Sequence, residues 1–326
     1  MHDEYQIEKT CNMLTPGDGK PCKFYIRPNK ATEPGFCTQP DQFRCIEAMK
    51  IKLPAISYSR LADFIRCKQR YKHAVIDGLE VKPKHLPEPI KLGTGWDVFI
   101  RSLYNKEYEL STELQSLQLN PIQTAKISAL TRAYVDLEIQ NRTDRLLGCQ
   151  YKIHAPIGQN QIIGYVDRAY QNHIIETKLS ARPDFFKQRE NLNYQLSTYF
   201  MGNEAWDYAD VEITRVPALR PKPDESAEAY GERCYGDIIS RPAFYFQGWD
   251  RKTRTFGVRF WRSEFDLDEI FHTYVWVLKE LRDTVKRGSW YPNNLACHVP
   301  APCPFLPIKK SGVISPEIYE KREVKK

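Results

Sequence analysis

Two acidic residues and a lysine lie close together in a segment that alternates like β-strands. Asp167 ends one run of β-branched residues, and Glu176 and Lys178 lie on the next run. Side chains alternate along a strand, so Glu176 and Lys178 share one face. If the two runs pair, Asp167 reaches that face, and the two carboxylates form an oxygen site suited to Mg²⁺ or Mn²⁺. An ion there would polarise a phosphodiester, and Lys178 would stabilise charge on the phosphate.

The context of this segment separates it from an ordinary exposed hairpin, on which a Glu–Lys pair is common. Gly164 precedes Asp167 by three residues, and both predicted strands are apolar. The helix expected next places Gln195 and Tyr199 one turn apart on the same face. These two residues are expected either to contact the substrate backbone or to pack at the edge of the core.

The elements that must position these residues alternate between helical and strand periodicity. Helices are predicted from a Ser57–Ser59 cap, near Gly95, at 122–140, at about 190–206 and from an Asp266 cap to Gly288. Strands are predicted at 161–167, 173–178 and 211–216, with a hairpin at 243–249 and 255–261. Residues 217–242 are expected to form an exposed excursion. The order predicts an α/β or α+β fold around one central sheet.

The composition is that of an ordinary globular protein, with 41% hydrophobic and 27% charged residues in 326. A net charge of +7 permits nucleic acid binding without establishing it. No apolar run approaches the roughly 20 residues of a membrane span, and no secretory signal is recognisable. We therefore expect no membrane partner. The absence of a phosphate-binding G-x-x-x-x-G-K-[ST] loop and of a Ser–His or Cys–His arrangement disfavours an ATP-driven motor and a triad hydrolase.

Nine cysteines are distributed unevenly along the chain. Residues 1–50 contain Cys11, Cys22, Cys37 and Cys45 among many prolines and glycines. In a reducing compartment, metal ligation explains clustered cysteines better than disulfides do. The spacing lacks a C-x-x-C pair, so it is not a standard zinc ribbon. The segment is expected either to bind a structural Zn²⁺ or to lie over the main domain.

The order of motifs resembles the PD-(D/E)XK nuclease superfamily, and more narrowly its RecB-like and CRISPR-associated exonucleases. The pattern G-x-x-D is followed by I-x-E-x-K and then by Q-x-x-x-Y, at Gly164, Asp167, Ile174, Glu176, Lys178, Gln195 and Tyr199. Upstream, residues 56–61 with Phe64 and Cys67 resemble the first helix of that group. Gly93 with Asp97 is similar to its G-x-x-x-H segment, although an Asp replaces the His. The resemblance covers roughly residues 56 to 303.

The resemblance implies a restriction-endonuclease-like core, a central mixed sheet flanked by helices, over residues 51–308. Residues 1–50 would be a Cys-rich segment and residues 309–326 a flexible tail. The implied activity is Mg²⁺- or Mn²⁺-dependent cutting of DNA, often from an end. The implied metal ligands are Asp97, Asp167, Glu176 and the carbonyl of Thr177. Lys178 would act in catalysis, and Gln195 and Tyr199 would position the DNA.

The resemblance also implies partners and a second metal group. Relatives work beside a helicase, recombinase or integrase in DNA repair and recombination, in the cytoplasm of prokaryotes or encoded by viruses. Several hold an iron–sulfur cluster, and Cys67, Cys297 and Cys303 match three of its four cysteines. The fourth would lie near Lys309, where no cysteine stands, so an intact cluster is not expected. Cys67 as a small buried hydrophobic residue is the alternative.

Two readings of the chain remain open beside the nuclease. A DNA-end binding or adaptor protein would keep the fold without cutting, in line with the Asp at the His position. A zinc-stabilised interaction module would carry the hairpin by chance. Basic residues near the first helix and after the hairpin are expected either to follow phosphates or to form a solvated face: Arg60, Arg66, Lys68, Arg70, Arg182, Lys187 and Arg189.

Overall fold

The computed structural model describes residues 25–26, 36–37, 56–105, 110–139, 145–158, 160–297 and 303–322. The chain divides into two units, Met1–Pro54 with Val324–Lys326, and Ala55–Glu323. In the first unit, β1 (Tyr25–Ile26) and β2 (Phe36–Cys37) pair antiparallel. The predicted zinc ligands Cys11, Cys22 and Cys45 lie outside the described residues, as does the side chain of Cys37.

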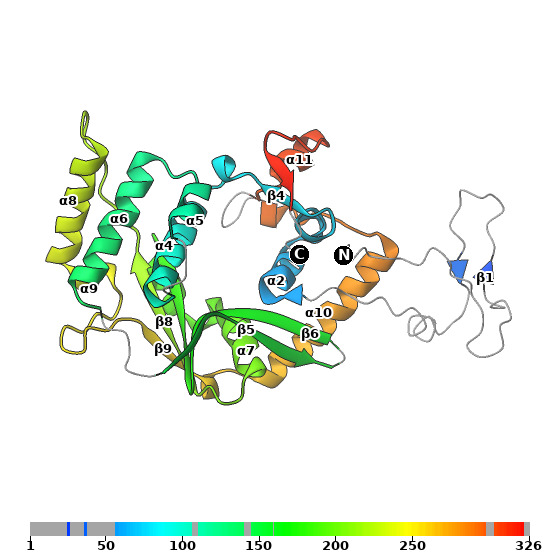
Figure 1. Ribbon diagram of the computed structural model, residues 1–326. Helices are drawn as coiled ribbons and strands as arrows, with labels where there is room; N and C mark the ends of the chain where they lie inside the picture. The colour runs from blue at the N-terminus through cyan, green and yellow to red at the C-terminus, as the bar shows by residue number, and fades with distance from the viewer. Residues whose placement is uncertain are drawn as a thin grey trace. The chain divides into compact units, whose positions relative to one another are not determined.

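A six-stranded mixed sheet forms the centre of the second unit (Figure 1). Its strands are β3 (Ile56–Ser57), β5 (Leu146–Ile157), β6 (Asn160–Tyr170), β7 (His173–Ser180), β8 (Tyr208–Arg215) and β9 (Val258–Trp261). Their order is β3–β6–β7–β8–β9, and β5 also pairs with β6. Strands β6 and β7 are antiparallel, whereas β7 and β8 are parallel. The predicted pairing of the two runs that carry Asp167 and Glu176 is confirmed.

Helices flank this sheet. They are α2 (Tyr58–Arg66), α3 (Lys68–Tyr71), α4 (Glu88–Tyr104), α5 (Leu110–Ser116), α6 (Pro121–Asp136), α7 (Asn193–Gly202), α8 (Ala227–Ser240), α9 (Pro242–Tyr245), α10 (Leu267–Arg287) and α11 (Leu306–Ser311). Single turns occur at Lys72–Ile76, Pro83–His85, Pro183–Lys187 (η3), Arg189–Asn191, Arg262–Glu264 and Leu295–Cys297. The prediction of an α/β class with a mixed central sheet and flanking helices is confirmed.

Local sequence signals set several helix ends as predicted. The Ser57 hydroxyl accepts a hydrogen bond from the Arg60 amide (3.3 Å) and caps α2. The Asp266 carboxylate accepts from the Glu269 amide (2.9 Å) and caps α10. Gly288 ends α10 with a φ of 65°, a left-handed conformation that glycine adopts without strain.

Two helical layers cover the sheet (Figure 1). Helix α4 packs against β7, and α6 and α8 pack beside it around a core that includes Trp96, Tyr134 and Tyr230. Helix α7 packs against β5 and β6, with α10 alongside. Close approach of α7 requires Gly164, because a Cβ there would lie 2.9 Å from both Tyr199 Cε1 and Ile153 Cδ1. The helix that carries Gln195 and Tyr199 is therefore held tightly over the strand that carries Asp167.

Several expectations about individual elements were wrong. Strand β5 was not predicted. The expected excursion at 217–242 contains α8, whose buried residues Tyr230, Cys234 and Ile238 follow helical spacing. The expected hairpin is replaced by α9, an isolated bridge between Asp250 and Thr255, and β9, which pairs with β8. Propensity and turn residues misled here because tertiary packing decided the outcome.

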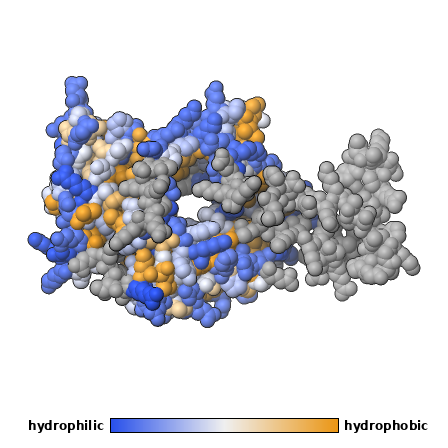
Figure 2. All heavy atoms as spheres, viewed as in Figure 1, coloured by the Kyte–Doolittle hydropathy of each residue, from blue (hydrophilic) through white to orange (hydrophobic). Residues whose placement is uncertain are grey.

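The segment from Lys309 was expected to be a loose tail, and the described part of it is structured. β10 (Tyr319–Lys321) pairs antiparallel with β4 (Leu79–Val81). A small apolar cluster of Leu79, Phe305, Ile308 and Tyr319 stabilises this pairing. The face of the second unit seen in Figure 2 is mostly hydrophilic, with separate hydrophobic patches. Within the described part of the chain, no helix is long and apolar enough to cross a membrane.

Candidate active site

Asp167 and Glu176 meet where β6 and β7 adjoin. The Asp167 Oδ2 accepts a hydrogen bond from the backbone amide of Thr177 (2.8 Å), so the backbone of β7 orients this carboxylate. Glu176 is only 2% exposed. The two carboxylates that the sequence placed on neighbouring strands are therefore close enough to interact, and one of them is removed from water.

Lys178 lies on the same face of β7 as Glu176, as strand alternation predicted. Its Nζ is 2.5 Å from Glu176 Oε1. Burial lowers the pKa of Lys178, but the charges of Glu176, Tyr58 and Asp167 and the hydrogen bond to Glu176 together outweigh burial and hold the pKa above its usual value. Lys178 is therefore a cation at neutral pH, suited to balancing negative charge and unsuited to accepting a proton.

The two residues of α7 that the sequence singled out contact this cluster. Gln195 Nε2 donates to Glu176 Oε1 (2.6 Å) and to the Tyr199 hydroxyl (2.8 Å). The Tyr199 hydroxyl donates to the Tyr165 carbonyl (2.8 Å). Both side chains are buried, and their hydrogen bonds orient the Glu176 carboxylate from the side of α7. Direct contact with DNA, which the resemblance implied, is not favoured by this burial.

Asp97 reaches the cluster from α4. Its Oδ2 forms an ion pair with Arg101 one turn later (3.1 Å). The amide nitrogen of Gln150 on β5 links Asp97 to Asp167, at 3.4 Å from Asp97 Oδ1 and 2.9 Å from Asp167 Oδ1. Gln150 has a φ of 47°, in the left-handed region that is unfavourable for residues other than glycine. The backbone of β5 is thus strained at Gln150, the residue whose side chain bridges the carboxylates of Asp97 and Asp167.

The electrostatics of the cluster are those of crowded carboxylates. Burial raises the pKa of Asp97 to about 6, and the charge of Asp167 adds to this effect, while Arg101 opposes it. Burial likewise raises the pKa of Glu176, with Asp167 again adding to it and Lys178 opposing. Carboxylates whose pKa is raised by burial and by a neighbouring carboxylate are stabilised by a nearby cation.

Three residues at the cluster received no role from the sequence. Gln150 and Arg101 have no motif that marks them, since one lies on an unpredicted strand and the other is one of many arginines. Tyr58 begins α2, and its ring lies edge-on to that of Tyr199, with centroids 6.4 Å apart. Burial raises the pKa of Tyr58 to about 12, so its hydroxyl keeps its proton.

The donor types suit a hard divalent ion, but the side chains are arranged for hydrogen bonding. Among the described residues, no three His, Cys, Asp or Glu side chains lie close enough together to hold a metal ion. The Gln150 amide contacts Asp97 and Asp167, and the Lys178 ammonium contacts Glu176. An ion coordinated by these oxygens therefore requires both donors to turn away. Burial and the charge of Asp167 raise the pKa of Asp97, and a nearby cation would favour its ionised form, which supports such a rearrangement.

The three cysteines matched to an iron–sulfur cluster line one small cavity. Cys67 and Cys297 are buried, and Cys303 lies beside them. Lys309, where the resemblance implied a fourth cysteine, has its Nζ 3.4 Å from Cys297 Sγ. Burial raises the pKa of the Cys303 thiol, which favours its protonated form. The three cysteines therefore line the same cavity, but among the described residues they form no group that could hold a metal ion, and Lys309 stands where the fourth cysteine would lie.

The two groups of basic residues differ in their surroundings. Near the first helix, Lys68 pairs with Glu280 (2.5 Å) and Arg70 with Asp63 (2.7 Å). After β7, Arg182 and Arg189 are exposed, although Arg189 donates to the Glu264 carbonyl. Lys187 also pairs with Asp184 (2.9 Å) and Arg189 with Glu190 (3.8 Å), so exposure alone distinguishes the group after β7.

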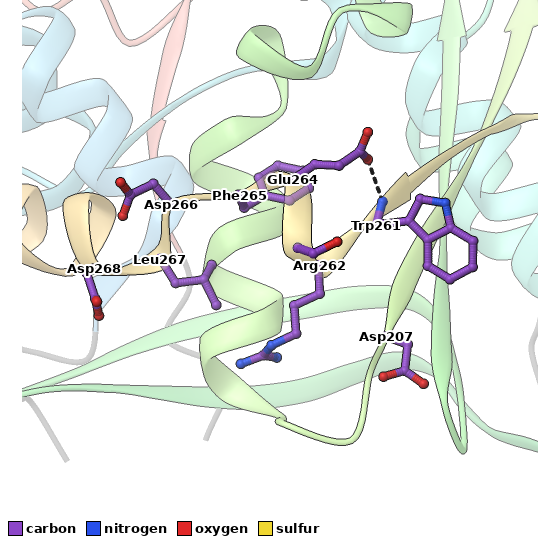
Figure 3. A pocket seen from close by; sticks show the side chains of 9 residues that line it. Asp207, Trp261, Arg262, Glu264, Phe265, Asp266, Leu267 and Asp268 are labelled. Carbon is purple, nitrogen blue, oxygen red and sulfur yellow. Dashed lines mark hydrogen bonds between the residues drawn. The ribbon is translucent and has the colours of Figure 1, made fainter.

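A surface depression of about 890 Å³ lies where β9 leads into α10 (Figure 3). It is lined by Asp207, Trp261, Arg262, Ser263, Glu264, Phe265, Asp266, Leu267 and Asp268. The Trp261 amide donates to the Glu264 carboxylate (2.6 Å), and Arg262 donates to the Phe200 carbonyl (2.6 Å). The depression contains none of the predicted site residues, and its polar groups serve helix capping and loop closure.

Comparisons with known proteins add no family to this picture. No family model matches the chain, and neither a curated protein nor a solved structure is significantly similar to it.

Proposed function

We propose that this protein is a Mg²⁺- or Mn²⁺-dependent deoxyribonuclease that hydrolyses phosphodiester bonds and acts from DNA ends. One observation carries the proposal: a buried Glu176 contacts Lys178 beside Asp167 on the adjoining strand, and Asp97 approaches from a helix. Burial and the charge of Asp167 raise the pKa values of both Asp97 and Glu176, and perturbed carboxylates of this kind cluster at functional sites. Processing of DNA in repair or recombination, beside a helicase, recombinase or integrase, is the role we propose.

Each side chain of the cluster has a task in this proposal. Asp167, Glu176 and Asp97 would hold the ion, together with the Thr177 carbonyl. A bound divalent ion supplies polarisation of the phosphate and activation of water. Lys178 carries its positive charge at neutral pH and would stabilise the charge that develops on the phosphate.

Gln195 and Tyr199 act through Glu176. The Gln195 amide contacts both the Glu176 carboxylate and the Tyr199 hydroxyl, which is itself bonded to the β6 backbone. This chain of hydrogen bonds holds Glu176 at a defined angle when Lys178 turns toward substrate. We therefore propose that Gln195 and Tyr199 position the metal ligand, which keeps them near the DNA without touching it.

A DNA-end binding protein that does not cut is the second candidate. The observation that favours it is the occupation of the carboxylates by Gln150 and Lys178, together with the lack of a three-ligand metal group among the residues the structure describes. In that case the cluster would be a former active site whose carboxylates are bonded to Gln150 and Lys178 instead of to a metal ion. The two candidates differ in one measurable property, cleavage that depends on a divalent ion.

Cleavage of fluorescent DNA by wild type and by Lys178→Ala tests the proposal. Linear double-stranded, linear single-stranded and circular DNA are incubated with Mg²⁺, Mn²⁺ or EDTA. Wild type should degrade linear DNA only with a metal ion, and Lys178→Ala should cut about 10²- to 10³-fold more slowly while still binding DNA. Sparing of circular DNA would support an exonuclease.

Lys91→Ala is the matched control. Lys91 is also a buried lysine, 6% exposed, but its ammonium contacts the Gln118 carbonyl (3.2 Å) and none of the cluster residues. Its loss should lower stability without slowing cleavage per folded molecule. If metal-replete wild type binds DNA and cuts none of the substrates, the nuclease proposal fails and the binding protein replaces it.

A further inference from the structure

The pairing of β6 with β7 ends at the candidate active site. On the side of the site, the last residues that face each other in the ladder are Arg168 and Ile175. Asp167 and Glu176 are the next residues along the two strands. Beyond the ladder, the Thr177 amide donates a hydrogen bond to the Asp167 carboxylate (2.8 Å). Side chains therefore hold the two strands together where the carboxylates meet.

The side chain of Arg168 makes further connections at this point. It is 1% exposed, and its guanidinium donates to the Thr177 hydroxyl on β7 (3.2 Å) and to the Glu212 carboxylate on β8. Glu212 faces Thr177 in the register of β7 and β8. The same guanidinium donates to the Tyr104 hydroxyl on α4 (2.7 Å) and lies 4.6 Å from the centre of that ring. One buried arginine thus joins three strands and a helix.

Three of these elements carry the proposed metal ligands. On β6, Arg168 directly follows Asp167, and on β7 the contacted residue is Thr177, whose carbonyl is a proposed ligand. On α4, Tyr104 lies seven residues after Asp97, which places both on one face of the helix. The contacts of Arg168 therefore reach every element from which a ligand would come.

Stability alone does not account for this arrangement. Arg168 and Glu212 form an ion pair in which both residues are buried, at 1% and 7% exposure. Removing two charges from water offsets most of their attraction, so an apolar pair of similar volume stabilises a core equally well. An apolar pair lacks the directional hydrogen bonds to Thr177 and Tyr104 that the guanidinium provides.

We propose that Arg168, held by Glu212, is a positioning residue that aligns the metal ligands of β6, β7 and α4 with one another. Partners that orient ligands without touching the ion commonly control how well the ion binds. This inference rests on the proposed function, because it concerns the ligands of the same site.

A double substitution separates positioning from folding. Arg168→Met alone would leave Glu212 buried without its partner, which strongly destabilises a protein. Arg168→Met with Glu212→Leu removes both charges, and the urea midpoint should stay near that of wild type. In calorimetric titration without DNA, this double variant should bind Mn²⁺ about 10- to 100-fold more weakly than wild type.

The matched control removes another ion pair of β8. Asp210, 3% exposed, pairs with Arg259 on β9 (2.9 Å). Arg259→Met with Asp210→Leu should bind Mn²⁺ as wild type does. An equal loss of Mn²⁺ affinity in this control would refute the proposal, because the loss would then follow from removing any ion pair on β8.

Thr177→Val provides a milder change and a measurement that needs no metal ion. It removes the hydroxyl that Arg168 contacts and keeps the Arg168–Glu212 pair and the carbonyl. It should weaken Mn²⁺ binding about 10-fold. In EDTA, hydrogen exchange of its own amide, which donates to Asp167, should become about 10-fold faster relative to the intrinsic rate. Thr177→Ser should restore both properties.

The outcomes separate this inference from the proposed function. If the double variant and Thr177→Val bind Mn²⁺ as tightly as wild type while wild type cuts DNA, positioning by Arg168 is refuted and the nuclease stands. If Thr177→Val exchanges its amide faster but wild type neither binds Mn²⁺ nor cuts, the alignment of Asp167 with Thr177 stands and the nuclease fails. If the double variant does not fold, unchanged exchange and affinity in Thr177→Val refute the proposal.

Discussion

Replacing Asp97 with Asn should stabilise the metal-free protein at neutral pH, although it removes an ion pair with Arg101. Burial and the charge of Asp167 raise the pKa of Asp97 from 3.8 to about 6, which means that the folded state disfavours the ionised carboxylate despite Arg101. Asn resembles the protonated, neutral form of the side chain. The substitution therefore relieves repulsion that the wild-type protein tolerates.

The magnitude follows from the shift in pKa. A pKa that rises by about two costs about 3 kcal/mol in the free energy of ionising Asp97, since a rise of one costs about 1.4 kcal/mol. The Asp97 side chain is 32% exposed, so solvent screening reduces the expected gain to about 1–2 kcal/mol. For a domain of this size, such a gain raises the melting temperature by about 2–6 °C.

The sign of the pH dependence is fixed by the same shift. Below pH 3.8, Asp97 is protonated in the folded and the unfolded state, and the ionisation cost is zero. As pH rises from about 4 to about 6, only the unfolded state releases its proton readily, so wild type loses stability through this window. Above about 6 the loss is complete. The advantage of Asp97→Asn should therefore be near zero at pH 4 and full at pH 7.5.

Urea unfolding in EDTA at both pH values measures this difference. Asp184→Asn is the control, because contact with Lys187 lowers the pKa of Asp184 and removal of that carboxylate should not stabilise the protein. Added Mn²⁺ should stabilise wild type at pH 7.5 and stabilise Asp97→Asn less. An Asp97→Asn variant that is less stable than wild type at pH 7.5, or equally shifted at both pH values, would refute the reasoning.

Two further perturbations test the positions of the same residues. Gly164→Ala should lower stability by about 1–3 kcal/mol and slow cleavage, because the added Cβ would lie 2.9 Å from Tyr199 Cε1. Urea unfolding measures the loss of stability. Gly93→Ala is the control and should not destabilise the protein, because no atom lies within 4 Å of the added Cβ. Single-turnover cleavage should fall as pH drops through about 6, because the raised pKa values of Asp97 and Glu176 let protons compete with the metal ion. A rate that stays flat from pH 5 to 8 would contradict carboxylate ligation.

Local signals explain why part of the fold was predictable. The β6–β7 pair rests on alternation within about twenty residues, and the caps at Ser57 and Asp266 act on amides three residues away. Helix α8 had a readable signal as well, since Tyr230, Cys234 and Ile238 repeat every four residues. The Pro-rich segment before α8 led to the prediction of an exposed excursion instead of this helix.

The sequence by itself determined that Glu176 and Lys178 share a face, because a strand alternates its side chains, and that Asp167 lies on the adjoining strand. Asp97 entered the expected site only through the family resemblance, and the tertiary structure decided that Asp97 and Gln150 lie beside Asp167. Asp97 arrives on a helix that precedes β6 in the chain, and Gln150 bridges two carboxylates with a left-handed backbone that no motif encodes. Contacts of this kind depend on how separate elements pack, and packing is a property of the whole core that short-range spacing does not contain.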